Sequence, residues 1–419
     1  MLDRAVSTPD RSQAAAAIRS VLARGIPLRS LAPALGKSLS ALADTDRAQA
    51  QRVGRLLVEL GGASDETLYG CLSSVAADDS TMARQLRVRR AAGADVTPKR
   101  RGQLMLEAAQ LALETGAIAE AASHLRQAAS LAADLDQIVE ASTAIREAVE
   151  DVPEEQRSDC LIELAHADAW AAEQQDTRSA VTAWRRLAAT RWDLASDRIG
   201  AEAAFFIACS QEPDLGPFRY AADLVDRAGA ADAVEMIARR TETLEQGEHE
   251  GLKGRLQAAA GWVAAQHGMF DRALDLSIAA IRSNPFQTDA VAVVERVADG
   301  EEGIEALNLV YDIIASSALG KFGVRAAHYR AARQLEQRGA HADALRHAVS
   351  AFEAVPSEGA CHALLLRLAS RCDDDDAAVR SMANVASSGA PESRLTWLKR
   401  AAELATTSSH GRELRFDLF

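Results

Sequence analysis

Large aromatic side chains are scarce in this chain, since only 4% of its 419 residues are Phe, Trp or Tyr. Alanine takes much of their place and makes up about a fifth of the sequence. One compact core of this size would need more large apolar side chains, whereas alanine favours helices and lets them pack closely. The composition therefore argues against a single large globule and for many closely packed helices.

Paired cysteines and long apolar runs are also missing. The five cysteines are scattered without a CxxC pair, which indicates buried thiols in a reducing compartment rather than a disulfide framework. No run approaches the roughly 20 apolar residues that cross a bilayer. The first residues, from Met1 to Arg4, lack the apolar core of a signal peptide. We therefore expect a cytoplasmic protein that does not engage a membrane.

Known catalytic and metal-binding patterns are absent as well. The sequence has no Walker A loop and no Gly-x-Gly-x-x-Gly loop. Its nine histidines show no His-Glu-x-x-His spacing, and His341 and His347 share a hairpin without other ligand types nearby. The run Asp373–Asp376 lacks the glycine and final glutamate of a calcium loop and suits the positive end of a helix. The sequence predicts no enzyme, no cofactor and no metal.

One pattern is present three times: a glycine, an alanine five residues later and a second alanine seven further on. The copies are Gly116/Ala121/Ala128, Gly268/Ala273/Ala280 and Gly339/Ala344/Ala351. Pro285 and Pro356 follow the last two copies at the same offset. A tight turn, two small residues on one helix face and then a helix breaker describe the second half of a helical hairpin. A repeat of about 34 residues built this way indicates a solenoid, which offers an extended binding surface rather than a catalytic pocket.

Helical periodicity continues almost from end to end, and no segment shows the sustained alternation of a strand. We therefore expect an all-α chain of roughly 20 helices, with prolines such as Pro153 and Pro391 at helix borders. The polar interruption Ala91–Arg101 predicts a module boundary, and a softer boundary is expected near Gln211–Gly216. The expected parts are an N-terminal helical module of weak repeat character, a repeat array and a C-terminal tail, at residues 1–91, 99–407 and 408–419.

These residues resemble the tetratricopeptide repeat (TPR) superfamily. The segment Gly268–Pro285 fits its second helix, and Ala260-Gly261 stands where that superfamily places a small pair in the first helix. Degenerate copies are centred on Ala180, Ala233 and Ala306. Residues 99–370 carry the resemblance, although the large residue expected early in the first helix is Met105, Gln257 or His328 and never Trp. The resemblance implies an α-solenoid of stacked antiparallel hairpins.

In such arrays the first helix of each hairpin lines a concave face that binds proteins or peptides. Carried over residue by residue, this implies a partner-binding surface of Arg255, Trp262 and Gln266 in one repeat and Tyr329, Arg333 and Gln337 in the next. Aromatic and arginine side chains together are typical of interface hot spots. The alternative is that Trp262 and Tyr329 simply pack between repeats.

A basic segment interrupts this acidic chain, whose net charge is −13. It places seven cations in 18 residues: Arg84, Arg87, Arg89, Arg90, Lys99, Arg100 and Arg101. They could bind an acidic peptide, a phosphate or a nucleic-acid backbone. However, no aromatic residues are interleaved for base stacking, and the net charge disfavours broad nucleic-acid binding. A solvated helix end with its loop explains the same run.

The chain ends Arg415-Phe416-Asp417-Leu418-Phe419. This segment resembles the short peptide by which many bacterial proteins dock on the DNA sliding clamp, with Arg415 in place of the usual glutamine. The alternative is that its apolar side chains cap the last helix pair. For the chain as a whole, we expect a non-enzymatic scaffold or adaptor that binds a protein or peptide. The alternative is a nucleic-acid-associated protein that uses residues 84–101 or the C-terminal tail. The identity of the partner and the oligomeric state stay open.

Overall fold

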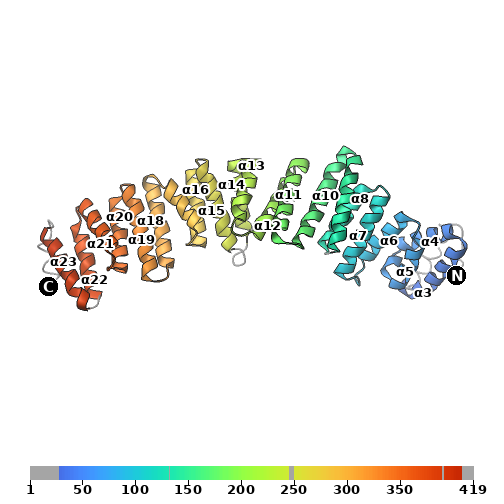
Figure 1. Cartoon of the computed structure of the whole chain (residues 1–419), viewed down its shortest axis with the longest axis horizontal. Coiled ribbons are helices and arrows are strands. Elements are labelled where there is room, and N and C mark those ends of the chain that lie inside the picture. Colours follow the sequence, from blue (N-terminus) through green and yellow to red (C-terminus); the bar gives the residue numbers. More distant parts are fainter. Residues whose placement is uncertain (1–27, 132, 245–249, 389–390, 408–419) are drawn as a thin grey trace. The chain divides into compact units, whose positions relative to one another are not determined.

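The computed structural model describes residues 28–131, 133–244, 250–388 and 391–407. Regular structure in these ranges is entirely helical, with 21 α-helices, two short 3₁₀ helices and no strand (Figure 1). The prediction of an all-α chain with roughly 20 helices is confirmed. None of the described helices is both long enough and apolar enough to span a membrane.

The chain divides into two compact units, Met1–Glu212 and Pro213–Phe419. The division coincides with the softer boundary expected near Gln211–Gly216. Within unit 1, helix α6 (Ser80–Ala91) packs against α7 (Pro98–Glu114) across the polar segment between them. The predicted module boundary between residues 1–91 and 99–407 stays a prediction.

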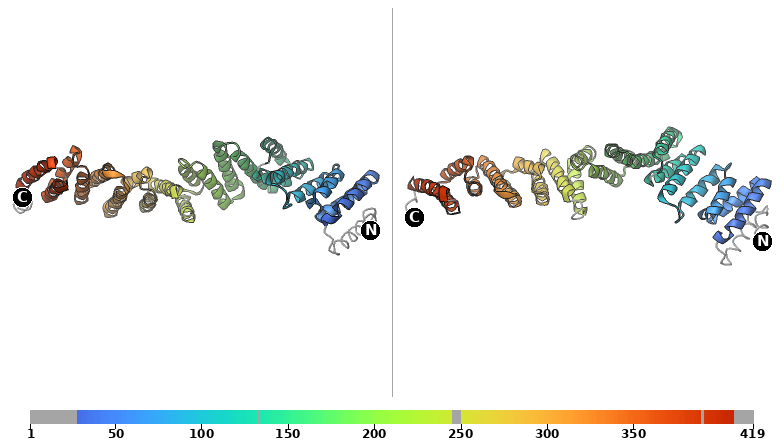
Figure 2. Two further views of the ribbon diagram at one scale, coloured as in Figure 1. Left: turned by 90° about the horizontal axis from the view of Figure 1, so that it is seen from below. Right: turned by 60° about the horizontal axis from the view of Figure 1, so that its bottom comes forward.

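Unit 1 is a run of helices in which neighbours along the chain pack side by side (Figures 1 and 2). Helices α7 and α8, α10 and α11, and α11 and α12 form closely packed pairs, and α8 also packs on α10. Besides α6 and α7, its elements are α3 (Leu28–Thr45), α4 (Arg47–Glu59), η1 (Gly62–Ser64), α5 (Glu66–Val75), α8 (Ile118–Ser130), α9 (Leu135–Ala148), η2 (Val149–Asp151), α10 (Glu154–Glu173), α11 (Thr177–Ala195) and α12 (Arg198–Gln211).

Unit 2 is more regular, because its helices pair into five successive hairpins followed by a final helix that packs on the last hairpin. The hairpins are α13 (Gly216–Ala228) with α14 (Ala230–Thr243), α15 (Glu250–Gln266) with α16 (Phe270–Ser283), α17 (Thr288–Val297) with α18 (Gly300–Ser317), α19 (Gly320–Gln337) with α20 (His341–Ala354), and α21 (Gly359–Arg371) with α22 (Asp375–Ser388), followed by α23 (Pro391–Thr407).

The three glycines of the repeated pattern make the turns between hairpin helices. Gly116, Gly268 and Gly339 have φ angles of 70°, 76° and 77°, in the left-handed region that glycine adopts without strain. In each turn the residue after the glycine donates its backbone N–H to the carbonyl five residues earlier, over 2.8, 2.9 and 3.0 Å. This bond belongs to the Schellman motif, which satisfies carbonyls left free at a helix end. The glycine is therefore required by the turn that folds each hairpin.

The six alanines of the pattern are completely buried on α8, α16 and α20. Ala180, Ala233 and Ala306, at the centres of the degenerate copies, are buried on α11, α14 and α18. The closeness of the helices is clearest at Gly261 of α15, where an added Cβ would lie 2.7 Å from Oγ of Ser277 on α16. The small residues are present because these helices approach too closely for larger ones.

Aromatic residues contribute to the cores of both units. In unit 1, Trp184 is buried, stacks edge-on against Trp170 at 5.5 Å between ring centroids and donates its Nε1–H to Glu173 over 2.8 Å. In unit 2, Phe352 of α20 is fully buried and meets Trp397 of α23 edge-on at 5.0 Å. Trp184 thus belongs to the core of unit 1, and an aromatic contact joins α23 to the rest of unit 2.

A half-buried histidine of unit 1 makes the stability of that unit depend on pH. Burial, followed by the charges of Arg191 and Arg126, lowers the pKa of His166 to about 4. The Nη2 of Arg191 lies 2.5 Å from Nε2 of His166, and the carboxylate of Glu163 pairs with Arg126. An unfolded histidine has a pKa near 6.5, so between pH 6.5 and 4 the unfolded state binds more protons than the folded state. Stability contributed by this residue is present above pH 6.5 and is lost as the pH falls towards 4.

We therefore expect the free energy of unfolding of unit 1 to fall by up to about 1.4 kcal/mol per pH unit below pH 6.5 on account of His166. Urea unfolding of the wild type and of His166→Gln between pH 7.5 and 5 measures this term as the difference between the two slopes. The exposed His267→Gln serves as the control and should keep the wild-type slope. Parallel slopes for the wild type and His166→Gln would contradict the assignment.

Candidate functional site

Three arginines converge on one carboxylate on the first helices of two consecutive hairpins in unit 2. Arg367 of α21 donates from Nε and Nη2 to the two oxygens of Glu336 on α19, at 2.9 Å each. Arg371, one turn further along α21, donates to Oε1 of Glu336 over 2.8 Å. Arg333, one turn earlier on α19, lies 4.0 Å from Oε2 of Glu336. We call these four residues the arginine cluster.

The arginine cluster carries two more positive charges than negative ones. The Glu336 side chain is only 11% exposed, whereas those of the three arginines are 45–49% exposed. Hydrogen bonding from Arg367 is the main cause that lowers the pKa of Glu336, so this carboxylate stays ionised at neutral pH. A guanidinium has five N–H donors, and one shared carboxylate cannot occupy those of three arginines. The cluster therefore presents solvent-accessible donors that suit a further carboxylate or another oxyanion.

The contact between the preceding pair of first helices, α17 and α19, shows that this excess of positive charge is local. Glu295 of α17 accepts two hydrogen bonds of 2.6 Å from Arg330 of α19, and the hydroxyl of Tyr311 also donates to it. Glu295 and Arg330 are 35 residues apart, as are Glu336 and Arg371. A glutamate–arginine ion pair thus joins α17 to α19 and α19 to α21. The contact between α19 and α21 differs in having two additional arginines.

The structure places the predicted partner-binding residues on two first helices. Tyr329, Arg333 and Gln337 all lie on α19, where Tyr329 is half-buried against the core of unit 2 and the other two are exposed. Arg333 thus belongs to the arginine cluster, and its predicted neighbours lie on the same helix. This half of the prediction coincides with a charged and accessible surface.

The other three residues lie on α15, and one part of the expectation was wrong. Arg255 donates to the carbonyl of Pro213 over 2.8 Å and pairs with Asp214, while Trp262 is half-buried and Gln266 is exposed. The two triads were expected in consecutive repeats, but the hairpin α17–α18 lies between them. That hairpin was predicted as a degenerate copy centred on Ala306, because α17 has only 10 residues and the turn before α18 lacks the spacing of the pattern, but it was not counted between the two triads. The neighbour of α19 on the other side, α21, supplies arginines that sequence reasoning missed.

The basic segment of unit 1 is largely held by acidic side chains of the same unit. Arg84 pairs with Glu120 at 3.2 Å, and Arg87 donates to Glu107 over 2.7 Å. The buried Arg90 donates to Asp95 over 2.9 Å and pairs with Glu66. The hydrogen bond from Arg90 is the main cause that lowers the pKa of Asp95. These contacts join α6 to the elements packed around it.

Of the remaining cations of the segment, Lys99, Arg100 and Arg101 lie at the start of α7, and Arg89 lies at the end of α6. Arg100 is 3.6 Å from Glu107, Arg101 donates to the carbonyls of Gly93 and Val96, and Arg89 and Lys99 are exposed. Lys99 and Arg100 line a cavity of about 580 Å³ between the N-terminal ends of α7 and α9. Asp134, which caps α9, stands in the same wall. Anion binding by this segment stays a prediction.

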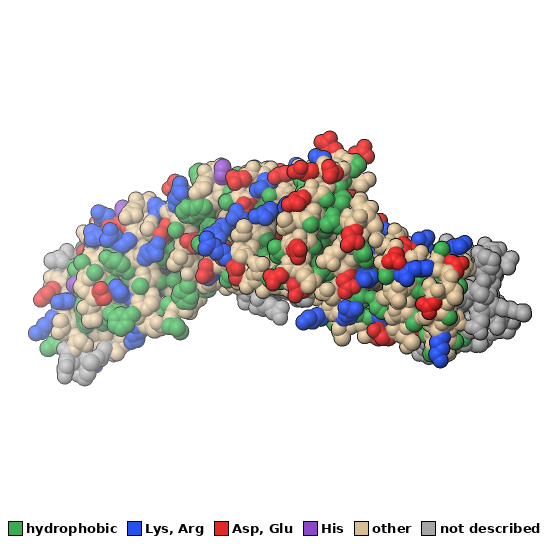
Figure 3. Space-filling model, turned by 45° about the vertical axis from the view of Figure 1, so that its right-hand side comes forward, with side chains coloured by type: hydrophobic (Ala, Val, Ile, Leu, Met, Phe, Trp, Pro, Cys, Tyr) green, Lys and Arg blue, Asp and Glu red, His purple; other side chains and the backbone are tan. Residues whose placement is uncertain are grey.

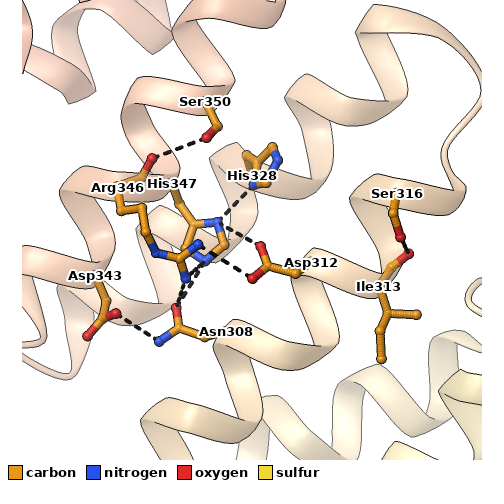
Figure 4. Close-up of polar contacts among 9 residues, drawn as sticks. All are labelled: Asn308, Asp312, Ile313, Ser316, His328, Asp343, Arg346, His347 and Ser350. Atoms are coloured by element: carbon orange, nitrogen blue, oxygen red, sulfur yellow. Dashed lines mark hydrogen bonds and ion pairs between the residues drawn. The ribbon is translucent and has the colours of Figure 1, made fainter.

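A second cluster of polar side chains was not anticipated from the sequence. Asp312 of α18, His328 of α19 and His347 of α20 bring one ligand atom each to within 4.8 Å of one another (Figure 4). His328 is the residue found where TPR proteins carry a large side chain early in the first helix. Because the three residues come from three different helices, no short motif in the sequence reports them. Only the packing of hairpin α17–α18 on hairpin α19–α20 brings them together.

Charged side chains of both signs are interspersed over the face of the molecule seen in Figure 3, rather than gathered into one field of a single sign. This arrangement disfavours broad attraction of a polyanion and leaves local clusters to select a partner.

The C-terminal residues Arg415–Phe419 lie outside the described residues, so capping and docking stay predictions. Asp374 accepts the N–H of Ala377 at the start of α22, which confirms the helix-end reading of the aspartate run.

No protein-family model matches the chain, and no curated protein matches it. Among solved structures it is similar to the crystal structure of yeast Tom70, at 10% identity and a TM-score of 0.17, over 95% of this chain and 97% of that chain. It is also similar to a circular tandem repeat protein with novel repeat topology and enhanced subunit contact surfaces, at 16% identity and a TM-score of 0.16, over 99% and 92%. Superpositions with such low TM-scores carry no argument. The class follows from the hairpins themselves, and the described part of the chain is an all-α array of packed helical hairpins.

Proposed function

We propose that this protein is a non-enzymatic scaffold that binds an acidic segment of a partner protein on the first-helix face of unit 2. The observation that carries the proposal is the arginine cluster, where three half-exposed guanidinium groups share the single carboxylate of Glu336. Arginine binds carboxylates through two parallel hydrogen bonds, so the cluster can hold an aspartate, a glutamate or a chain terminus with defined geometry.

The surroundings of the cluster support an extended peptide rather than a small ligand. Tyr329 offers a half-buried ring next to the cluster, and Gln337 lies exposed at the end of the same helix. Aromatic and arginine side chains side by side supply contact area together with directed polar contacts, as interface hot spots require. The stacked hairpins repeat such a face along the array, which is how repeat proteins bind long segments.

A reducing compartment such as the cytoplasm fits the proposal, because all five cysteines are free thiols. Nucleic-acid association through residues 84–101 or the C-terminal tail is the alternative. It is less well supported, because Arg84, Arg87 and Arg90 already pair with carboxylates of unit 1.

The proposal predicts that a random peptide library displayed on phage and selected on the purified chain yields peptides rich in Asp and Glu. Arg367→Ala and Arg371→Ala should each weaken the binding of a selected synthetic peptide by about 1–2 kcal/mol, roughly 5- to 30-fold in Kd. Both side chains are half-exposed, so circular dichroism and thermal unfolding should stay close to the wild type. Fluorescence anisotropy of the labelled peptide measures the change.

The matched control is Arg272→Ala on α16. Arg272 is likewise a half-exposed arginine paired with a glutamate of the neighbouring hairpin, Glu235, but it lies on a second helix. It should leave the affinity unchanged. Selected peptides without acidic residues, or equal affinities for Arg367→Ala, Arg371→Ala and the wild type, would move the binding surface away from α19 and α21.

A further inference from the structure

We propose that Asp312, His328 and His347 form a binding site for one divalent zinc ion, which joins hairpin α17–α18 to hairpin α19–α20. The site is independent of peptide binding at the arginine cluster. It lies where α18, α19 and α20 meet, and its three potential ligand atoms are two imidazole nitrogens and one carboxylate oxygen (Figure 4).

The geometry is already close to that of a tetrahedral zinc site. The Nδ1 atoms of His328 and His347 are 2.8 Å apart, and Nδ1 of His347 is 4.0 Å from Oδ1 of Asp312. Zinc bonds of about 2.0–2.1 Å to nitrogen or oxygen place neighbouring tetrahedral ligands about 3.3 Å apart. The two ring nitrogens must therefore separate by about 0.5 Å, and the carboxylate oxygen must approach Nδ1 of His347 by about 0.7 Å. Asp312 can make this movement, because its side chain is 48% exposed.

A second layer of polar contacts surrounds Nε2 of His347, the ring nitrogen that faces away from the site. The amide nitrogen of Asn308 donates to Asp343 over 2.9 Å, so its Oδ1 is the atom that faces Nε2 of His347 at 3.0 Å. A proton on Nε2 of His347 suits that oxygen, which can only accept, and leaves Nδ1 unprotonated, whereas Nη2 of Arg346, 3.2 Å from the same Nε2, suits the opposite tautomer. Histidine ligands of zinc usually donate their other N–H to such an oxygen, which orients the ring. Without a metal ion, the two Nδ1 atoms of His328 and His347 share one hydrogen bond of 2.8 Å, which the metal replaces.

The charges of the site favour a divalent cation. Two carboxylates, Asp312 and Asp343, face one guanidinium, that of Arg346, whose Nη1 lies 3.4 Å from Oδ2 of Asp312. Oδ1 of Asp312 is thus left for a metal while Oδ2 keeps its arginine. Burial and the charge of Arg346 lower the pKa of His347 to about 4, so this imidazole is neutral and able to bind a metal at pH 7.

The ligand types select among metals. Two imidazoles and one carboxylate suit zinc, whereas calcium and magnesium prefer sites made of oxygen atoms. Three protein ligands leave the fourth tetrahedral position to water. Because the ligands come from two adjacent hairpins, binding should stabilise their packing against each other, since a metal that binds only the folded state shifts the equilibrium towards it.

The test uses the full chain without a polyhistidine tag, freed of metal by a chelator and titrated with Zn²⁺ in a calorimeter. Co²⁺ is added separately as a spectroscopic probe, because tetrahedral coordination gives it visible absorption. We expect one Zn²⁺ per chain and a higher Tm with zinc. Asp312→Asn and His328→Gln should each lower the zinc affinity more than about tenfold, and Asn308→Ala, which removes the acceptor for His347, about 10- to 100-fold.

His267→Gln, at an exposed histidine directly after α15, is the control for binding of zinc to surface histidines and should keep the wild-type affinity. If His328→Gln fails to fold, Asp312→Asn decides the question, because its half-exposed side chain is not needed for the core. Absence of stoichiometric zinc binding, or wild-type affinity in Asp312→Asn, would overturn the proposal and leave the three residues as a hydrogen-bonded contact between hairpins.

Discussion

Replacing Phe352 with alanine should lower the free energy of unfolding of unit 2 by about 3–5 kcal/mol. The side chain is fully buried on α20, and its ring meets those of Trp397 and His362 at 5.0 and 5.7 Å between centroids. Removing it loses the burial of a large apolar group and leaves a cavity that the surrounding helices cannot fill completely. Because Trp397 belongs to α23, the last helix should lose protection first. Hydrogen exchange of α20 to α23, with urea unfolding of the whole chain, measures both effects.

The same substitution at Phe322 is the matched control. Phe322 is also in unit 2, on α19, but it is 71% exposed. Phe322→Ala should change the free energy of unfolding by no more than about 0.5 kcal/mol. Equal destabilisation by the two substitutions would mean that the contact between α20 and α23 does not hold the end of the array.

Enlarging the small residue at the contact between hairpin helices should also destabilise unit 2. Ala344→Leu is expected to cost about 1–3 kcal/mol, because the added carbons have no room and must displace side chains or backbone. Ala344 is fully buried on α20, next to the Gly339 turn. Ala273→Leu on α16 should behave alike, since an added Cβ at Gly261 of the facing helix would lie 3.3 Å from the carbonyl oxygen of Ala273. Thermal and urea unfolding measure the loss.

Ala342→Leu provides the control on the same helix. Ala342 lies two residues before Ala344 but is exposed, and leucine has nearly the helix propensity of alanine. Its unfolding free energy should therefore stay near that of the wild type. Wild-type stability in both Ala344→Leu and Ala273→Leu would show that the repeat register assigned to these helices is wrong.

The parts of the fold that depend on short sequence patterns were predictable. A glycine that must adopt a left-handed conformation and an alanine that must face a close helix are local requirements, and both recur at fixed spacing around Gly268 and Gly339. Hairpin α17–α18 was predicted only as a degenerate copy centred on Ala306. Its turn contains Gly300 but places it at a different distance from the buried Ala306. A sequence pattern therefore predicts a hairpin correctly where the turn glycine and the buried alanine keep the same distance along the chain.

The two polar clusters could not be predicted in the same way, since their members meet only through the packing of helices. Glu336 and Arg367 come from different hairpins, and the sequence offers no reason to pair them before the order of first helices is known. His328 was noticed only as a departure from the large side chain found in TPR proteins. Its partner His347 is buried on the next helix, and the stacking of one further hairpin adds Asp312. Prediction of such sites requires the register between helices to be correct within one residue.

The ion pairs between first helices have a consequence for how an array of this kind can change its length. Glu295 with Arg330 and Glu336 with Arg371 have the same separation along the chain, so hairpin α19–α20 presents an arginine to its predecessor and a carboxylate to its successor. A duplicated hairpin inserted at this point would meet compatible charges on both sides. Gene duplication within the array could therefore add a hairpin, and with it new binding surface, without first having to redesign the junctions.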